Sequence, residues 1–214
     1  MLVHSVCGYR SNTDGWNDGW TNTDYRARNL VKGVKREPFR GFSEWHVRAT
    51  RQILRVENTP NGQAVALRVA TSKLLDLFNA AGIAAGPLIP VPSSQTIASG
   101  GDYTGARLAR AVSGILQDVV ATPVLYFDAP QPRAHDGGAR RWQDVLPHLR
   151  GNTDGIRSPA ILIDDVMTSG GHLRACARYL QARGIEVQHA FVVGRTVWQR
   201  PAEMFSIPAE HLML

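Results

Sequence analysis

Residues 160–173 read AILIDDVMTSGGHL, and this stretch decides the fold that we expect for the chain. Its first four residues form a continuous apolar run, and a pair of acids follows directly, a pattern typical of a strand buried on both faces of a sheet. A short loop of Thr, Ser and Gly follows. A helix is predicted next, over residues 172–183, with Gly184 as its stop. A buried strand that passes through such a loop into a helix is typical of a parallel α/β sheet.

The rest of the chain alternates in the same way. Helical periodicity is clear at 64–80, where Gly82 provides a stop, and again around Leu108 and Val112. The predicted strands are 87–92, 122–128, 160–164, which was described above, and 185–193. We therefore predict an α/β fold with a parallel sheet flanked by helices. The expected division is an N-terminal hood and basic segment (1–55), an α/β core (56–196) and a C-terminal cap (197–214) that forms a small hood with the N-terminus.

The loop after the predicted strand has the chemistry of a phosphate site. The first amides of a helix point outward unpaired, and the helix dipole favours an anion there. Gly170 and Gly171 permit close approach of the backbone, and Thr168 and Ser169 add hydroxyl donors. His172 completes the expected phosphate-binding loop.

The acid pair is suited to a different part of the same ligand. Asp164 and Asp165 would repel a phosphate, whereas their carboxylates accept hydrogen bonds from vicinal hydroxyls. In open α/β sheets, ligands bind at the carboxyl ends of the strands, where both groups are expected. A molecule with a phosphate at one end and a diol beside it, such as ribose 5-phosphate, matches the pattern.

Composition sets the class of protein. The chain has 214 residues and a formal net charge of +6, which suits an anionic partner, either phosphorylated metabolites or nucleic acid. The charge does not separate these two from a solvated basic surface. Cys7 and Cys176 are too few for a four-cysteine zinc site, and two reduced thiols fit a cytoplasmic protein. No apolar run reaches the ~20 residues that span a bilayer, so no membrane association is expected.

The motif at 160–172 resembles the site of type I phosphoribosyltransferases, which bind phosphoribosyl pyrophosphate (PRPP). The resemblance implies that Asp164 and Asp165 hold the ribose hydroxyls and act at the reacting sugar. It implies that Thr168–His172 wrap the 5′-phosphate, although the family usually has Thr, Ser, Ala or Arg where this chain has His172. The expected reaction moves 5-phosphoribose from PRPP to a nitrogenous base and releases pyrophosphate. The expected cofactor is Mg²⁺, bound to the acids indirectly, through the ribose or water.

Within the family, the chain loosely resembles the ComF-like branch. The stretches that carry this resemblance are LIPVPS (88–93), YRARNLVKGVK (25–35) and GARLA (105–109). Two departures stand against it: the zinc-binding cysteines of that branch are absent, and the loop SSQTIASGGDYTG (93–105) lacks its arginines.

The pyrophosphate side of the site is therefore predicted from scattered residues. Ser93, Ser94 and backbone amides are candidates, together with three arginines of the segment 129–142 that form either a mobile lid or a solvated basic loop; these are Arg133, Arg140 and Arg141. Arg195, just after the last strand, is a candidate for the base side, with edge packing as the alternative.

Two other functions remain open at this stage. One is a regulator that senses PRPP without turnover, and the other is a ComF-like accessory for nucleic-acid uptake. The sequence identifies neither the acceptor base nor the oligomeric state, and a homodimer is one option.

Overall fold

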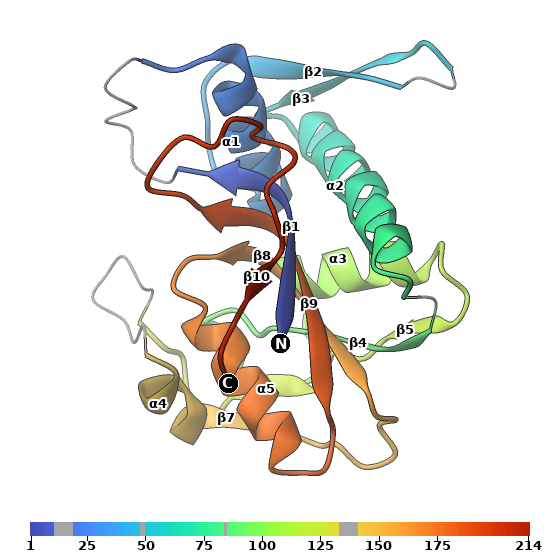
Figure 1. Cartoon of the computed structure of the whole chain (residues 1–214), viewed down its shortest axis with the longest axis vertical. Coiled ribbons are helices and arrows are strands. Elements are labelled where there is room, and N and C mark those ends of the chain that lie inside the picture. Colours follow the sequence, from blue (N-terminus) through green and yellow to red (C-terminus); the bar gives the residue numbers. More distant parts are fainter. Residues whose placement is uncertain (11–18, 48–49, 84, 133–140) are drawn as a thin grey trace.

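A six-stranded sheet forms the centre of the molecule (Figure 1). The computed structural model describes residues 1–10, 19–47, 50–83, 85–132 and 141–214. The strand order is β10-β1-β9-β8-β4-β5. The four pairings among β1, β9, β8, β4 and β5 are parallel, and only the edge strand β10 runs antiparallel to its neighbour. The predicted α/β class is confirmed.

The strands are β1 (Leu2–Tyr9), β2 (Phe42–His46), β3 (Ile53–Glu57), β4 (Gly86–Pro90), β5 (Val119–Ala121), β6 (Leu125–Phe127), β7 (Leu149–Gly151), β8 (Ala160–Met167), β9 (Val187–Thr196) and β10 (Glu210–His211). The helices are α1 (Asn22–Lys35), α2 (Pro60–Ala80), α3 (Thr104–Ser113), α4 (Trp142–Val145), the short 3₁₀ helix η2 (Leu146–His148) and α5 (Gly171–Gln181). Strands β2 and β3 form a separate hairpin beside α1 and α2, and β6 pairs with β7.

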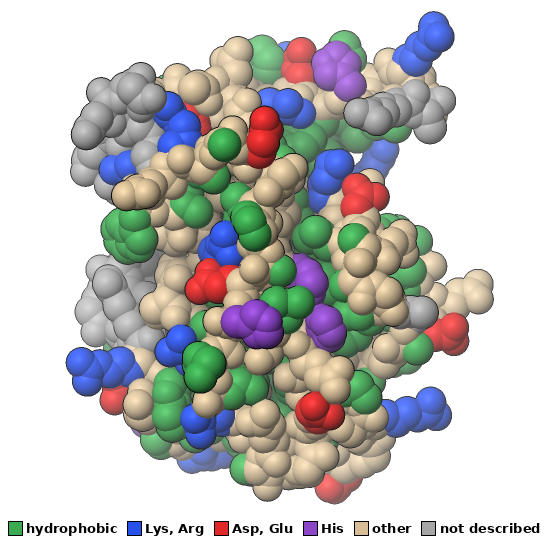
Figure 2. Space-filling model, viewed as in Figure 1, with side chains coloured by type: hydrophobic (Ala, Val, Ile, Leu, Met, Phe, Trp, Pro, Cys, Tyr) green, Lys and Arg blue, Asp and Glu red, His purple; other side chains and the backbone are tan. Residues whose placement is uncertain are grey.

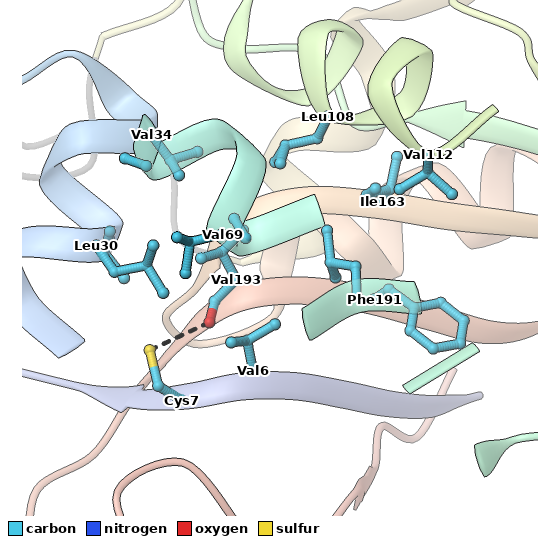
Figure 3. Close-up of a cluster of buried hydrophobic side chains, with 14 of the residues drawn as sticks. Val6, Cys7, Leu30, Val34, Val69, Leu108, Val112, Ile163, Phe191 and Val193 are labelled. Carbon is cyan, nitrogen blue, oxygen red and sulfur yellow. Dashed lines mark hydrogen bonds between the residues drawn. The ribbon is translucent and has the colours of Figure 1, made fainter. Parts of the chain in front are cut away.

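The two faces of the sheet bury two different apolar clusters. Side chains of α1, α2 and α3 pack on one face with Ile163 of β8 and Phe191 of β9 (Figure 3). Helices α4 and α5 cover the other face, where Leu162 lies fully buried. Because β8 is covered on both faces, it reads as the uninterrupted apolar run seen in the sequence.

The N-terminal residues differ from the prediction. Residues 2–9, which we expected in a loop-rich hood, form β1 inside the main sheet, where they pair in parallel with β9. Both cysteines are buried and free, and the Cys7 thiol donates to the Val193 carbonyl at 3.3 Å (Figure 3). The buried positions of β1 are set by its pairing with β9, so the segment alone did not predict a strand.

The predicted strand 122–128 is also corrected. The sheet edge is the three-residue β5, and residues 125–127 leave the sheet to pair antiparallel with β7.

In the described residues, we find no helix with the length and hydrophobicity needed to span a membrane.

Candidate functional site

The acid pair lies in the middle of the sheet, near the carboxyl end of β8. The sequence analysis predicted that the strand ends at Asp164, which is wrong. The strand continues through Val166 and Met167, because its parallel ladder with β9 extends to the pair Met167–Arg195. Both acids are partly buried, and the amide of Asp165 donates to the Asp164 carboxylate at 2.8 Å. Strand β8 therefore holds two carboxylates rigidly where the sheet meets the loop.

The two carboxylates have different neighbours, because successive side chains of a strand point to opposite faces. Burial, reinforced by the adjacent Asp165, raises the pKa of Asp164 well above its usual range. Burial also raises the pKa of Asp165, but the Lys35 ammonium opposes this shift and favours the charged form. Asp165 is thus the acid with the stronger support for its negative charge.

The loop that follows β8 has only three residues before α5 begins at Gly171. Its last residue, Gly170, is the N-cap, with φ 75° in the left-handed region, and as a glycine it has no side chain that could cap the helix. A Cβ added to Gly170 would meet Leu212 Cδ1 at 2.7 Å. Glycine is therefore required at this position for two reasons: the backbone has a positive φ, and Leu212 of the C-terminal segment leaves no room for a Cβ.

The start of α5 is a ready anion site. The first amides of an α-helix have no intrahelical partner, so those of Gly171 and His172 are directed outward at the loop. Thr168 and Ser169 are exposed beside them. The predicted loop Thr168–His172 thus lies next to the acids in space as well as in sequence.

His172 faces the protein more than the loop. Its ring lies edge-on to Phe127, with the centroids 6.0 Å apart, and burial lowers the pKa of the imidazole. A neutral ring packed in this way leaves the backbone amide as the part of His172 suited to the phosphate.

Two basic residues that the sequence analysis did not assign, Lys35 and Arg107, lie close enough to Asp165 to interact with it electrostatically, and Arg36 lies beside Arg107. Lys35, at the end of α1, pairs with Glu37 at 2.6 Å. Burial acts to lower the pKa of Lys35, but Asp165 and Glu37 together outweigh it and raise the pKa. Lys35 is therefore held as a cation next to the acid pair.

Arg107 and Arg36 complete this group. Arg107, in the first turn of α3, contacts Asp102 at 3.6 Å and Thr104 at 3.0 Å, and its side chain is 16% exposed. Burial and then the positive charge of Arg36 lower the pKa of Arg107. Lys35, Arg36 and Arg107 form what we call the cation group, which lies on the α1 and α3 side of the acids.

The serines expected at the pyrophosphate are placed in the loop between β4 and α3. The hydroxyls of Ser93 and Thr96 lie 2.8 Å apart, and the Ser94 carbonyl accepts from the Gln131 amide at 2.7 Å. The first bond is internal to the loop, and the second ties the loop to the chain that follows β6. The serines follow the carboxyl end of β4, the neighbour of β8, which is the edge where ligands bind in open α/β sheets.

The remaining predicted arginines are spread out. Arg133 and Arg140 lie outside the described residues. Arg141 is exposed at the start of α4, with no described contact to the acid pair. Arg195 lies at the carboxyl end of β9, but its guanidinium is bonded to the Pro208 carbonyl at 3.0 Å and paired with Glu210 at 3.1 Å.

The cation group was missed for a physical reason. Lys35 and Arg36 occur in a basic helix that looks solvated, and nothing in the spacing brings that helix to a strand near the other end of the chain. The only sequence signal was the charge of 25–37, which a solvated helix shows equally well.

Comparison with known proteins gives a limited result. No protein-family model and no curated protein matches the chain. Among solved structures, it is similar to orotate phosphoribosyltransferase from Aeropyrum pernix, with a TM-score of 0.42 and 19% identity over 78% of this chain and 81% of that chain. It is similar to an adenine phosphoribosyltransferase at TM-score 0.42 and 9% identity, over 78% and 89% of the two chains.

A third similar structure is adenine phosphoribosyltransferase from Saccharomyces cerevisiae, complexed with D-2,5-dideoxy-2,5-imino-altritol 1,6-bisphosphate and adenine. The TM-score is 0.42 and the identity 11%, over 78% of this chain and 88% of that chain. At scores this low the similarity carries no argument, so the function has to be inferred from the chain's own site.

Proposed function

We propose that the chain binds PRPP and transfers its 5-phosphoribose to a nitrogenous base. One observation carries the proposal: two partly buried carboxylates on β8 lie directly beside a helix start whose N-cap must be glycine. The helix start suits the 5′-phosphate, and Asp164 and Asp165 suit the ribose hydroxyls. A ribose 5-phosphate group carries both features, a phosphate and a vicinal diol, within one small molecule.

The chemistry of the site suits a sugar that develops positive charge as its pyrophosphate leaves. The carboxylate of Asp165 stabilises such a cation electrostatically, and the loop and strand fix its position. Asp164 and Asp165 offer hard oxygen acceptors, so the residues fit Mg²⁺ held indirectly, through the ribose or water. When bound, the ion supplies neutralisation of the pyrophosphate charge.

The cation group supports a pyrophosphate on the α1 and α3 side of the acids. Lys35, Arg36 and Arg107 gather three positive charges there, although the loop at 93–105 itself contains no Lys or Arg. The proposal therefore does not depend on Arg133, Arg140 and Arg141 as the source of charge.

Arg36 offers a test of this placement that does not weaken the fold. It ends α1 with φ 59°, a left-handed conformation that favours glycine, so we expect Arg36→Gly to keep or raise the melting temperature. Loss of its charge should weaken PRPP by roughly tenfold, the effect of one charge-assisted contact. Ribose 5-phosphate, which has no pyrophosphate, should be nearly unaffected. Titration of both ligands by calorimetry measures the difference.

The matched control is Arg51→Gly, because Arg51 also has a positive φ, 55°, but lies by the β2–β3 hairpin. It should gain the same backbone relief without any change in PRPP affinity. Equal loss of PRPP and ribose 5-phosphate in Arg36→Gly would show that the cation group does not face the pyrophosphate.

Turnover is tested by pyrophosphate release from Mg²⁺–PRPP with a panel of purine, pyrimidine and nicotinamide-type bases. Release that depends on one class of base is the result expected of a transferase. Tight PRPP binding without release with any base would favour the PRPP-sensing regulator instead. In the same assay, replacing Arg133, Arg140 and Arg141 with Ala tests the lid: undiminished release would show that these arginines are not required.

No observation favours the ComF-like accessory role over the transferase. On the face shown in Figure 2, Lys and Arg side chains are interspersed with acidic and apolar ones. Salt-sensitive DNA binding would be the discriminating measurement for that role.

A further inference from the structure

A second concave site lies on the opposite part of α5 from the phosphate loop. It is a groove of about 450 Å³ between the last turn of α5 and the segment that runs from η2 into β7. Its lining contains three apolar residues, Leu146, Leu149 and Ala182, together with Tyr179 and three basic residues, Arg150, Arg178 and Arg183. We call it the arginine groove. Gly171 and Arg178 are seven residues apart, so the two sites are separated by about 10 Å along the helix axis.

Two of the guanidinium groups are held by aromatic rings. The Arg178 guanidinium lies over Trp142, 4.2 Å from the ring centroid, and that of Arg183 lies over Tyr179 at 3.5 Å. One Arg183 N–H also donates to the Tyr179 carbonyl at 3.1 Å. Stacked guanidinium groups are already oriented, so less entropy is lost when their remaining N–H groups bind a ligand.

Two of the three guanidinium charges of the groove are not compensated. Arg150 is neutralised by Asp128 at 2.5 Å and donates to two backbone carbonyls. In the part of the chain that the structure describes, neither Arg178 nor Arg183 pairs with a carboxylate, and the lining contains no acid. Gathering three guanidinium groups around one groove is unfavourable for the free protein and favours an anionic ligand.

We propose that the arginine groove binds a phosphate ester of mononucleotide size. Its volume is within the range of small-molecule sites, about 300–1,000 Å³, and such sites combine apolar walls with a few well-placed polar groups. Arg178 and Arg183 hold the phosphate, because planar guanidinium groups match its oxygens. Leu146, Leu149 and Ala182 contact the organic part. This site is independent of the reaction proposed for the loop of β8.

The test follows the indole N–H signal of Trp142 by NMR, assigned through the Trp142→Phe variant. Titration with adenosine monophosphate should move this signal and saturate. In Arg183→Gln, half-saturation should need roughly ten times more ligand, the loss of one charge-assisted contact. Arg183 is exposed, so the variant should fold. Arg68→Ala, which removes an exposed arginine from α2, is the matched charge control and should behave like the parent.

A second arm separates the groove from the phosphate loop. In Gly170→Ala the Trp142 response should persist, because the loop is distorted and the groove is not. Loss of the response there would assign it to the loop and overturn the proposal, as would equal weakening in Arg183→Gln and Arg68→Ala, or no response in the parent.

The nature of the ligand is tested with two other probes. Inorganic phosphate at equal concentration should move the Trp142 signal less, since it makes no contact with the apolar residues of the groove. An equal response would contradict a phosphate ester. The third probe is a short single-stranded oligonucleotide, with its concentration expressed as phosphate. If it saturates the Trp142 response at a lower concentration than adenosine monophosphate does, the groove binds a polynucleotide, and the small-ligand proposal is overturned.

Discussion

The double variant Asp164→Asn with Asp165→Asn should lose PRPP affinity by about 100-fold or more, since two charge-assisted hydrogen bonds are each worth about 1.5–3 kcal/mol. Affinity for inorganic phosphate or sulfate should change little or increase slightly. The reason is the division of the site: the carboxylates serve the diol, and the amides at the start of α5 serve the phosphate. Calorimetric titration of the same sample with PRPP and with sulfate measures both.

The double variant should not be destabilised. The pKa of both acids is raised in the folded state. The folded protein therefore binds more protons than the unfolded chain once the pH rises above the unfolded-state pKa of these acids. In that pH range the two acids lower the free energy of unfolding. At neutral pH, Asn removes this penalty and keeps a side-chain oxygen for the Asp165 amide. We expect an equal or higher melting temperature. Equal losses of PRPP and sulfate binding would show that the division of roles is wrong.

Gly170→Ala should destabilise the protein and abolish anion binding at the loop. An alanine at φ 75° costs about 1–2 kcal/mol. Its Cβ would lie 2.7 Å from Leu212 Cδ1, and overpacking of this kind typically costs about 1–3 kcal/mol more. Relief of the clash requires the loop to move, which displaces the amides at the start of α5. Chemical denaturation and sulfate titration give the two effects.

Gly184→Ala is the matched control for this change. Gly184 also has a positive φ, 77°, but nothing lies within 4 Å of an added Cβ. It should show the backbone cost alone, with unchanged sulfate binding. In a second control, Leu212→Ala combined with Gly170→Ala should recover part of the lost affinity. Full sulfate affinity in Gly170→Ala itself would contradict the role of the loop.

The sequence predicted the parts of the molecule that local patterns encode. The apolar run of β8 predicted a buried central strand, and the run of small residues after it predicted the loop and α5. The helices at 60–80 and 104–113 followed from their periodicity. Each of these signals lies within about 20 consecutive residues.

The predictions that were wrong or missing concern elements whose place depends on contacts with residues far away in the sequence. The strand β1 was missed because its pairing partner β9 follows it by more than 170 residues, so no pattern within the N-terminal segment itself predicts that it joins the sheet. The exit of residues 125–127 from the sheet depends in the same way on β7. Lys35 could not be assigned to the site because its partner Asp165 is brought to it only by the packing of α1 on the sheet.

The most direct measurement is the melting temperature with and without Mg²⁺–PRPP. A ligand that binds only the folded state at about 100 times its Kd stabilises by about 2.7 kcal/mol, or roughly 5–10 °C for a chain of this length. We expect such a rise for the parent protein, and little or none for the Asp164→Asn, Asp165→Asn variant. No shift of the folded parent protein at millimolar PRPP with Mg²⁺ would contradict the proposed site.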